Sequence, residues 1–80
     1  MDISDVTKRV KNVVVEALKL KSPDIADDAN FIFDLGADSM QSLQLVGAFE
    51  EEFDIELDED KALEVQSISD AVKFISTYLE

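Results

Sequence analysis

Residues 35–53 read LGADSMQSLQLVGAFEEEF, and this stretch predicts a turn followed directly by a helix. Gly36 suits the turn because glycine tolerates backbone angles that other residues avoid. Asp38 and Ser39 are both good helix N-cap residues, and apolar residues recur at helical spacing immediately after them. We therefore expect a helix over residues 39–53. The Ser39 hydroxyl should lie at its first turn, beside the positive end of the helix dipole, where a phosphate is favoured.

Length and composition narrow the possible functions. The 80 residues are expected to form one small domain, 1–80. The chain has no cysteine and no histidine, so it lacks disulfides, thiolate metal sites and the commonest general base. A serine, cysteine or zinc hydrolase is therefore disfavoured. No apolar run is long enough for a membrane span or a signal peptide, which predicts a cytoplasmic protein.

The net charge of −12 is large for this length and is unevenly distributed. Residues 1–21 carry a net charge of +2, and residues 22–80 carry −14. Nucleic acid is disfavoured as a partner because its phosphates would be repelled. A protein partner with a basic surface is favoured by the same charge, although the acidic residues also serve solubility.

Three further helices are predicted, and no strand. The first starts near residue 3 and has Lys19 and Lys21 in its last turn, before Pro23. The others are a short segment at 59–65 and a last helix over residues 68–79. The fold class expected is all-α, a small four-helix bundle of three long helices and one short third helix. The first helix has one apolar face, formed by Ile3, Val6, Val10, Val13, Val14, Ala17 and Leu18.

Helix ends are predicted from capping residues. Asp2 or Ser4 can cap the first helix, and Lys19 and Lys21 should lie in its last turn. Ser67 should cap the last helix, with Asp70 in a capping-box position.

The connection over residues 22–38 is long for so small a domain. Ser22, Pro23 and Asp24 favour the start of a short helical turn. Ile25, Phe31 and Leu35 are spaced to hold the connection against the core. Phe33 is either exposed beside Ser39 or a further packing residue, and packing is slightly favoured.

The motif DLGADS at residues 34–39, followed by the acidic helix LQLVGAFEEEFDIEL at 43–57, resembles the acyl carrier proteins. The resemblance covers most of the chain and is strongest from Phe31 to Val72. It implies that Ser39 is the attachment point of 4′-phosphopantetheine, joined by a phosphopantetheinyl transferase. The thiol of that group would hold acyl chains as thioesters, so the protein would be a monomeric carrier and not an enzyme.

The resemblance also implies roles for other residues. Asp38 would help the transferase hold its magnesium, whereas from the residues alone Asp38 is a helix cap. The family's fold has a cleft for the acyl chain between its second and third helices. Candidate lining residues here are Leu45, Val46, Phe49, Leu57, Ala62 and Val65, although packing alone would also explain each of them.

The helix over 39–53 has two apolar stripes. Leu45, Val46, Phe49 and Phe53 should face the core. The other stripe is interpreted as a docking face for acyl-processing enzymes with basic patches; the alternative is a wide core stripe. The docking face comprises Met40, Leu43, Gln44, Gly47, Glu50 and Glu51.

Three features of this helix depart from the usual family pattern. Gln41 and Gln44 occupy positions where fatty-acid carriers have acids, and Gly47 occupies a position that is commonly large and apolar. We therefore expect a specialised carrier that serves a dedicated pathway rather than bulk fatty-acid synthesis.

Two alternative functions stay open at this point. An aminoacyl or peptidyl carrier would use the same serine, and an acidic adaptor domain would use Ser39 only as a cap. A metal site is not expected. Asp54, Glu56 and Asp58 alternate like EF-hand ligands, but Glu59 replaces the required glycine and Val65 the final glutamate.

Overall fold

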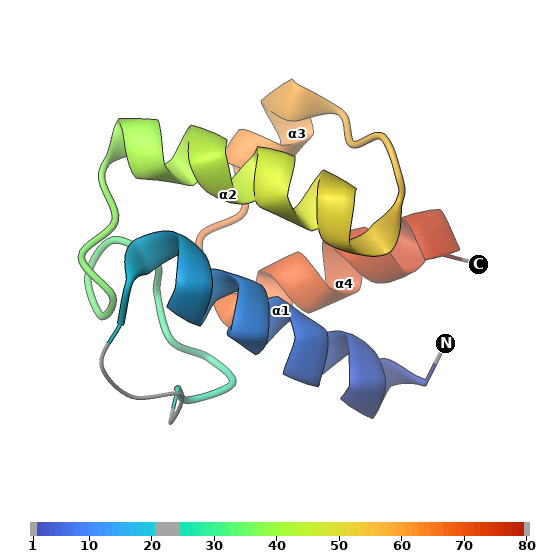
Figure 1. Ribbon diagram of the computed structural model, residues 1–80, viewed down its shortest axis with the longest axis horizontal. Helices are drawn as coiled ribbons and strands as arrows, with labels where there is room; N and C mark the ends of the chain where they lie inside the picture. The colour runs from blue at the N-terminus through green and yellow to red at the C-terminus, as the bar shows by residue number, and fades with distance from the viewer. Residues whose placement is uncertain (1, 21–24, 80) are drawn as a thin grey trace.

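The computed structural model describes residues 2–20 and 25–79, and these form a bundle of four helices (Figure 1). The long helices α1, α2 and α4 pack around a common core, and the short helix α3 lies beside α2 (Figure 1). The described residues contain no strand, only an isolated bridge between Asn30 and Ser67. The predicted fold class is confirmed. The helices are α1 (Ile3–Leu18), α2 (Ser39–Phe53), α3 (Glu59–Leu63) and α4 (Ile68–Leu79).

Helix α1 follows the predicted apolar face with one exception. Four valines of that face are buried, whereas Ile3 is 60% exposed. Ile3 is the first residue of the helix, where the core does not reach. Because valine is a poor helix former, α1 depends on tertiary packing. The buried valines are Val6, Val10, Val13 and Val14.

The ends of α1 differ in detail from the prediction. Asp2 is the N-cap residue, but its side chain makes no capping hydrogen bond; its Oδ2 accepts instead from the Ser4 hydroxyl at 3.2 Å. Lys19 is the C-cap residue, in the left-handed region at φ 54°, so its prediction as a last-turn residue is wrong. Lys21, the other lysine predicted there, lies outside the described residues.

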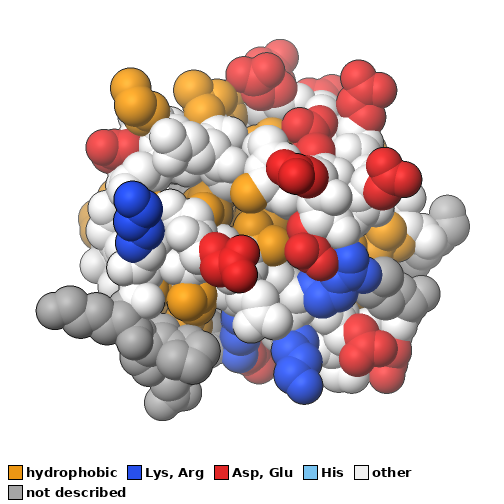
Figure 2. All heavy atoms as spheres, in the orientation of Figure 1, with side chains coloured by type: hydrophobic (Ala, Val, Ile, Leu, Met, Phe, Trp, Pro, Cys, Tyr) orange, Lys and Arg blue, Asp and Glu red, His pale blue; other side chains and the backbone are white. Residues whose placement is uncertain are grey.

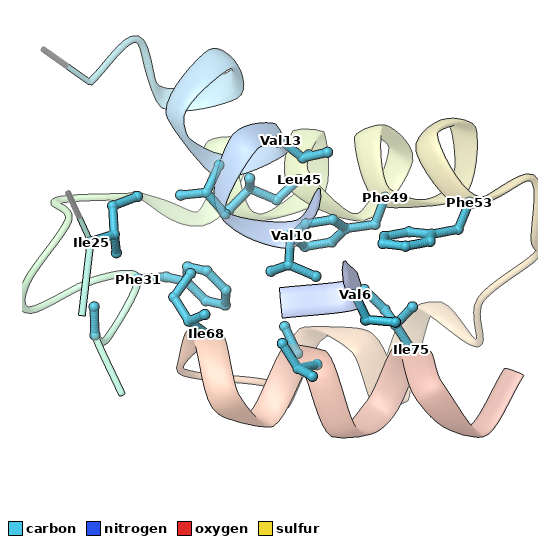
Figure 3. Packing of buried hydrophobic residues seen from close by; sticks show 14 of the residues in the cluster. Val6, Val10, Val13, Ile25, Phe31, Leu45, Phe49, Phe53, Ile68 and Ile75 are labelled. Atoms are coloured by element: carbon cyan, nitrogen blue, oxygen red, sulfur yellow. The ribbon is translucent and has the colours of Figure 1, made fainter. Parts of the chain in front are cut away.

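Helix α4 supplies the opposite wall of the core. Ile68 and Ile75 are almost completely buried. The Ser67 hydroxyl accepts from the backbone N–H of Asp70 at 3.2 Å, which confirms Ser67 as a cap. Figure 3 shows labelled side chains from α1, α2, α4 and the connection before α2 pointing into one core. In the described part of the chain, every helix is too short or too polar to cross a membrane.

The connection before α2 is tied to the start of α4 by backbone hydrogen bonds. Phe31 N–H donates to the carbonyl of Gln66 at 2.9 Å, and Ile68 N–H donates to the carbonyl of Ala29 at 3.0 Å. Ile25 and Phe31 are buried as predicted, and Leu35 is partly buried against the core. The helical turn predicted at residues 22–24 lies outside the described residues.

Phe33 is not a packing residue, so that prediction is wrong. Its side chain is 88% exposed. The Asn30 side-chain oxygen accepts from both Ile32 N–H and Phe33 N–H, each at 2.9 Å, and this tight turn directs Phe31 inward while Ile32 and Phe33 remain at the surface.

Arg9 joins α1 to the end of α2. Its Nε lies 2.7 Å from Glu52 Oε2, and its Nη2 donates to the Glu52 carbonyl at 2.6 Å. Its guanidinium carbon also lies 4.6 Å from the centroid of the Phe53 ring, close enough for a cation–π attraction. This partly exposed cluster orients the last turn of α2 relative to α1.

We predict that Ile75→Val lowers the free energy of unfolding by about 1 kcal/mol, because it removes a methylene from a filled core. The matched change Ile3→Val should alter it by less than about 0.5 kcal/mol, since Ile3 is exposed. Urea unfolding of the two variants and the parent measures both values. Equal losses for the two variants would contradict the packing described here.

Candidate functional site

Asp38 caps α2, and Ser39 is the first helical residue. Asp38 Oδ1 accepts from the backbone N–H of Gln41 at 2.8 Å. In return, Gln41 Oε1 accepts from the backbone N–H of Asp38 at 3.1 Å. This reciprocal pair is a complete capping box. Of the two capping candidates in the sequence, Asp38 therefore does the capping, and the interpretation of Ser39 as a cap is wrong.

The Ser39 side chain is exposed, and its hydroxyl has no hydrogen-bond partner among the described residues. It lies in the first turn of a 15-residue helix, where unpaired backbone N–H groups and the helix dipole favour an anionic neighbour. The hydroxyl is thus accessible to an external reagent, in surroundings that suit a phosphate.

The turn before α2 holds Ser39 at a defined distance from the core. Gly36 has φ 74°, the left-handed conformation that makes glycine favourable there. Ala37 N–H donates to the carbonyl of Phe31 at 2.8 Å, and Ala37 and Phe31 are both buried. The chain therefore leaves the core at Ala37 and reaches the surface two residues later, at Ser39.

Helix α2 presents opposite faces to the core and to solvent. Leu45, Phe49 and Phe53 are buried, whereas Met40 is 70% and Leu43 47% exposed. The interpretation of Met40 and Leu43 as part of a wide core stripe is therefore wrong. The solvent face carries most of the predicted docking residues, namely Met40, Leu43, Gln44, Gly47 and Glu51.

Glu50 does not share that exposure. It is half-buried, and its Oε2 accepts from the backbone N–H of Leu57 at 2.9 Å. Its carboxylate therefore stabilises the connection between α2 and α3. Nearby, Tyr78 Oη accepts from the backbone N–H of Asp58 at 3.2 Å, so two side chains from different helices hold this connection. Neither contact was foreseen, because both depend on the path the chain takes after α2 and not on helical spacing.

A small apolar cavity of about 30 Å³ lies between α2, α3 and α4. That volume is about the space one water molecule occupies in the liquid, so the walls must separate before a longer molecule can enter. All six residues predicted to line an acyl cleft lie along it: Leu45, Val46, Phe49, Leu57, Ala62 and Val65. Five further lining residues were not predicted. The sequence pattern shows which face of a helix is apolar, but not which side chains from different segments meet around a cavity. The five are Phe31, Ser42, Leu63, Phe74 and Ile75.

The acidic segment at 54–60 has local structural roles. Asp54 is the C-cap of α2 in the left-handed region, and Asp58 caps α3 by accepting from the backbone N–H of Lys61 at 3.2 Å. Within the described ranges, no group of three or more potential metal-ligating side chains comes together.

Comparisons with known proteins agree with this geometry. Residues 8–75 match the family model described as the phosphopantetheine attachment site. The chain is 49% identical over 77 residues to an acyl carrier protein of Phenylobacterium zucineum (strain HLK1), covering 96% of this chain and 98% of that protein. It also superposes with a TM-score of 0.82 on a solved structure assigned as an acyl carrier protein, from Mycobacterium tuberculosis. That match has 22% identity and covers 90% of this chain and 96% of the other.

Because Asp38 caps α2 and Ser39 does not, substitutions at these two positions should lower the free energy of unfolding by different amounts. Asp38→Ala should lower the free energy of unfolding by about 1 kcal/mol because it removes the helix cap. Ser39→Ala should change it by less than about 0.5 kcal/mol, since the hydroxyl makes no hydrogen bond to any residue that the structure describes. Urea unfolding measures both, with Asp38→Asn, which retains a capping side chain, as the control. A loss for Ser39→Ala as large as that for Asp38→Ala would contradict the assignment.

Proposed function

This chain belongs to the acyl carrier protein family, and from that premise we propose that Ser39 carries its prosthetic group. Members of the family carry covalently attached 4′-phosphopantetheine, whose terminal thiol holds acyl groups as thioesters. They are non-catalytic, so this chain is a carrier that delivers acyl groups to processing enzymes, and not an enzyme.

The state of the Ser39 hydroxyl supports this assignment most directly. It is exposed, it has no partner among the described residues, and Asp38 caps the helix in its place. The surrounding first turn of α2 favours a phosphate electrostatically. The residues present thus fit a phosphodiester at this position.

Asp38 is proposed to have a second role besides capping. It precedes Ser39, and only Oδ1 of its two carboxylate oxygens accepts a hydrogen bond from a described residue. The other oxygen is free to help the phosphopantetheinyl transferase hold its magnesium.

The exposed face of α2 is proposed as the docking face for acyl-processing enzymes. Met40, Leu43, Gln44 and Gly47 supply its neutral part, and Glu51 supplies charge near its end. The net charge of −14 over residues 22–80 favours partners with basic patches. Glu50 would contribute mainly through its field, since its carboxylate is engaged with the backbone of the following connection.

Other features of the carrier are proposed on less direct grounds. Residues 1–80 are proposed to work as one monomeric domain, because buried residues of α1, α2, α4 and the connections between helices form one core cluster. A cytoplasmic location, no binding to nucleic acid or membranes and service to a dedicated pathway remain predictions. An aminoacyl or peptidyl cargo also remains an alternative, distinguished by whether an adenylating ligase or an acyl transferase loads the arm.

The cavity between α2 and α4 is proposed to receive the acyl chain. Its walls are mainly aliphatic and aromatic, and they suit a hydrocarbon chain better than a polar one. Because α3 has only five residues and packs mainly on α2, we propose that displacement of α3 and its connections makes room for the chain.

Loading by coenzyme A tests the assignment of Ser39. A purified phosphopantetheinyl transferase should add one phosphopantetheinyl group to the parent chain and none to Ser39→Ala, as read by intact mass. Ser42→Ala is the matched control, because Ser42 lies on the same helix with its hydroxyl bonded to the Asp38 carbonyl at 3.0 Å. Loading of Ser39→Ala, or loss of loading in Ser42→Ala alone, would reject Ser39 as the site.

Filling the cavity tests the acyl site. Octanoylation of the loaded parent should raise its Tm because the chain buries apolar surface. Ala62→Leu, which fills the cavity from α3, should reduce that rise by at least about half. Ala26→Leu, at an exposed position, should leave it unchanged. A full rise in Ala62→Leu would show that the chain lies elsewhere.

A further inference from the structure

Large apolar side chains are exposed on both sequence sides of Ser39. Among the described residues, six large apolar side chains are exposed, and four of them lie between residues 32 and 43. We call these four the flanking apolar residues. Ile32 and Phe33 precede Ser39, and Met40 and Leu43 follow it; they are 56%, 88%, 70% and 47% exposed. In Figure 2, apolar side chains project at the end of the molecule where α2 begins.

The exposed apolar residues that follow Ser39 lie in an uncharged stretch, in contrast to the rest of this acidic chain. Residues 39–49 contain no charged side chain. The two nearest preceding acids are engaged with backbone: Asp34 Oδ2 accepts from Asn30 N–H at 2.7 Å, and Asp38 Oδ1 accepts from Gln41 N–H at 2.8 Å. Acidic side chains gather instead over the end of α2 and over α3 (Figure 2).

Phe33 is held near Ser39 by the backbone. The turn at 31–37 is closed by the hydrogen bond from Ala37 N–H to the Phe31 carbonyl. A second bond in the same turn, from Gly36 N–H to the Ile32 carbonyl at 3.2 Å, ties the neighbour of Phe33 to the residue three positions before Ser39. Phe33 is also the most exposed of the large apolar residues described, and it contributes little to the core. With Ile32, Met40 and Leu43 it forms a concentration of exposed apolar residues around Ser39 in the sequence, as contact sites commonly do.

We propose that Phe33, together with Met40 and Leu43, forms an apolar contact surface for the phosphopantetheinyl transferase that modifies Ser39. This inference rests on the proposed function. In the transfer, a bond forms between Ser39 Oγ and the phosphorus next to the pantetheine of coenzyme A. The pyrophosphate bond breaks, adenosine 3′,5′-bisphosphate leaves, and the serine proton passes to a base of the transferase.

The reach of the enzymes selects the transferase as the occupant. It must bring the reacting phosphorus to bonding distance of Ser39 Oγ, so its surface must cover the residues beside Ser39. Enzymes that process the acyl group meet it at the far end of the arm, so they can dock on α2 without contacting Phe33, which precedes that helix. Charge makes the contact more specific: the transferase should present apolar side chains to the flanking apolar residues and basic ones to the acidic end of α2.

Phe33 is then a specificity-determining residue for prosthetic-group attachment. An aromatic side chain supplies a large contact area with little entropy to lose, as interface anchors commonly do. Because the contact is apolar, its contribution should not weaken as salt screens charges. The acidic end of α2 should behave in the opposite way.

The test compares rates of loading from coenzyme A by a purified transferase that modifies the parent chain. Phe33→Ser should lower kcat/KM about tenfold, and Phe33→Tyr should retain most of the parent value. Ile3→Ser is the matched control, since Ile3 is 60% exposed and lies at the start of α1, far along the molecule from the start of α2 (Figure 1); it should load like the parent. Far-ultraviolet circular dichroism establishes that all variants are folded.

The test is completed by measuring loading at two salt concentrations and by measuring the reaction of a later acyl-processing enzyme. The ratio of parent to Phe33→Ser rates should be the same at low and high sodium chloride, whereas Glu51→Gln should matter only at low salt. Equal loading of Phe33→Ser and the parent, with Ser39→Ala unloaded, overturns this inference and leaves the proposed function intact. The inference is also overturned if Phe33→Ser slows only a later acyl-processing enzyme. Loading of Ser39→Ala would instead overturn the proposed function.

Discussion

The reciprocal hydrogen bonds between Asp38 and Gln41 determine where α2 begins, and the placement of Ser39 depends on them. They satisfy two backbone N–H groups at the helix start without using the serine hydroxyl. Ser39 can therefore be both helical and chemically available. Gln41 explains an apparent loss of charge as well: a glutamine at this position completes the cap without adding a second charge next to Asp38.

The rest of the molecule holds this helix start in place. Phe31 and Ala37 are buried and joined by a backbone hydrogen bond, so the turn carrying Gly36 is attached to the core immediately before Ser39. At the other end of α2, Arg9 contacts both Glu52 and Phe53. A helix held at both ends presents the same surface to every partner. The flexible part of the carrier is then the phosphopantetheine arm.

Charge and apolar surface are separated along α2. Its first three turns are neutral and expose Met40 and Leu43, and its last turn is acidic. One acid of that turn, Glu50, faces the connection to α3 and accepts from the backbone N–H of Leu57, a residue that lines the cavity. A carrier built this way can distinguish partners by apolar fit near the serine and by charge farther away.

The sequence by itself determined the helices, most of their apolar faces and the place of Ser39 at the start of α2, because spacing and capping chemistry are local properties. It left open which of Asp38 and Ser39 caps α2, since either side chain can do so. The exposure of Ile3 and Phe33 and the inward role of Glu50 were decided only by the tertiary structure. Burial depends on which other segments of the folded chain cover a side chain. A single sequence does not show which segments these are.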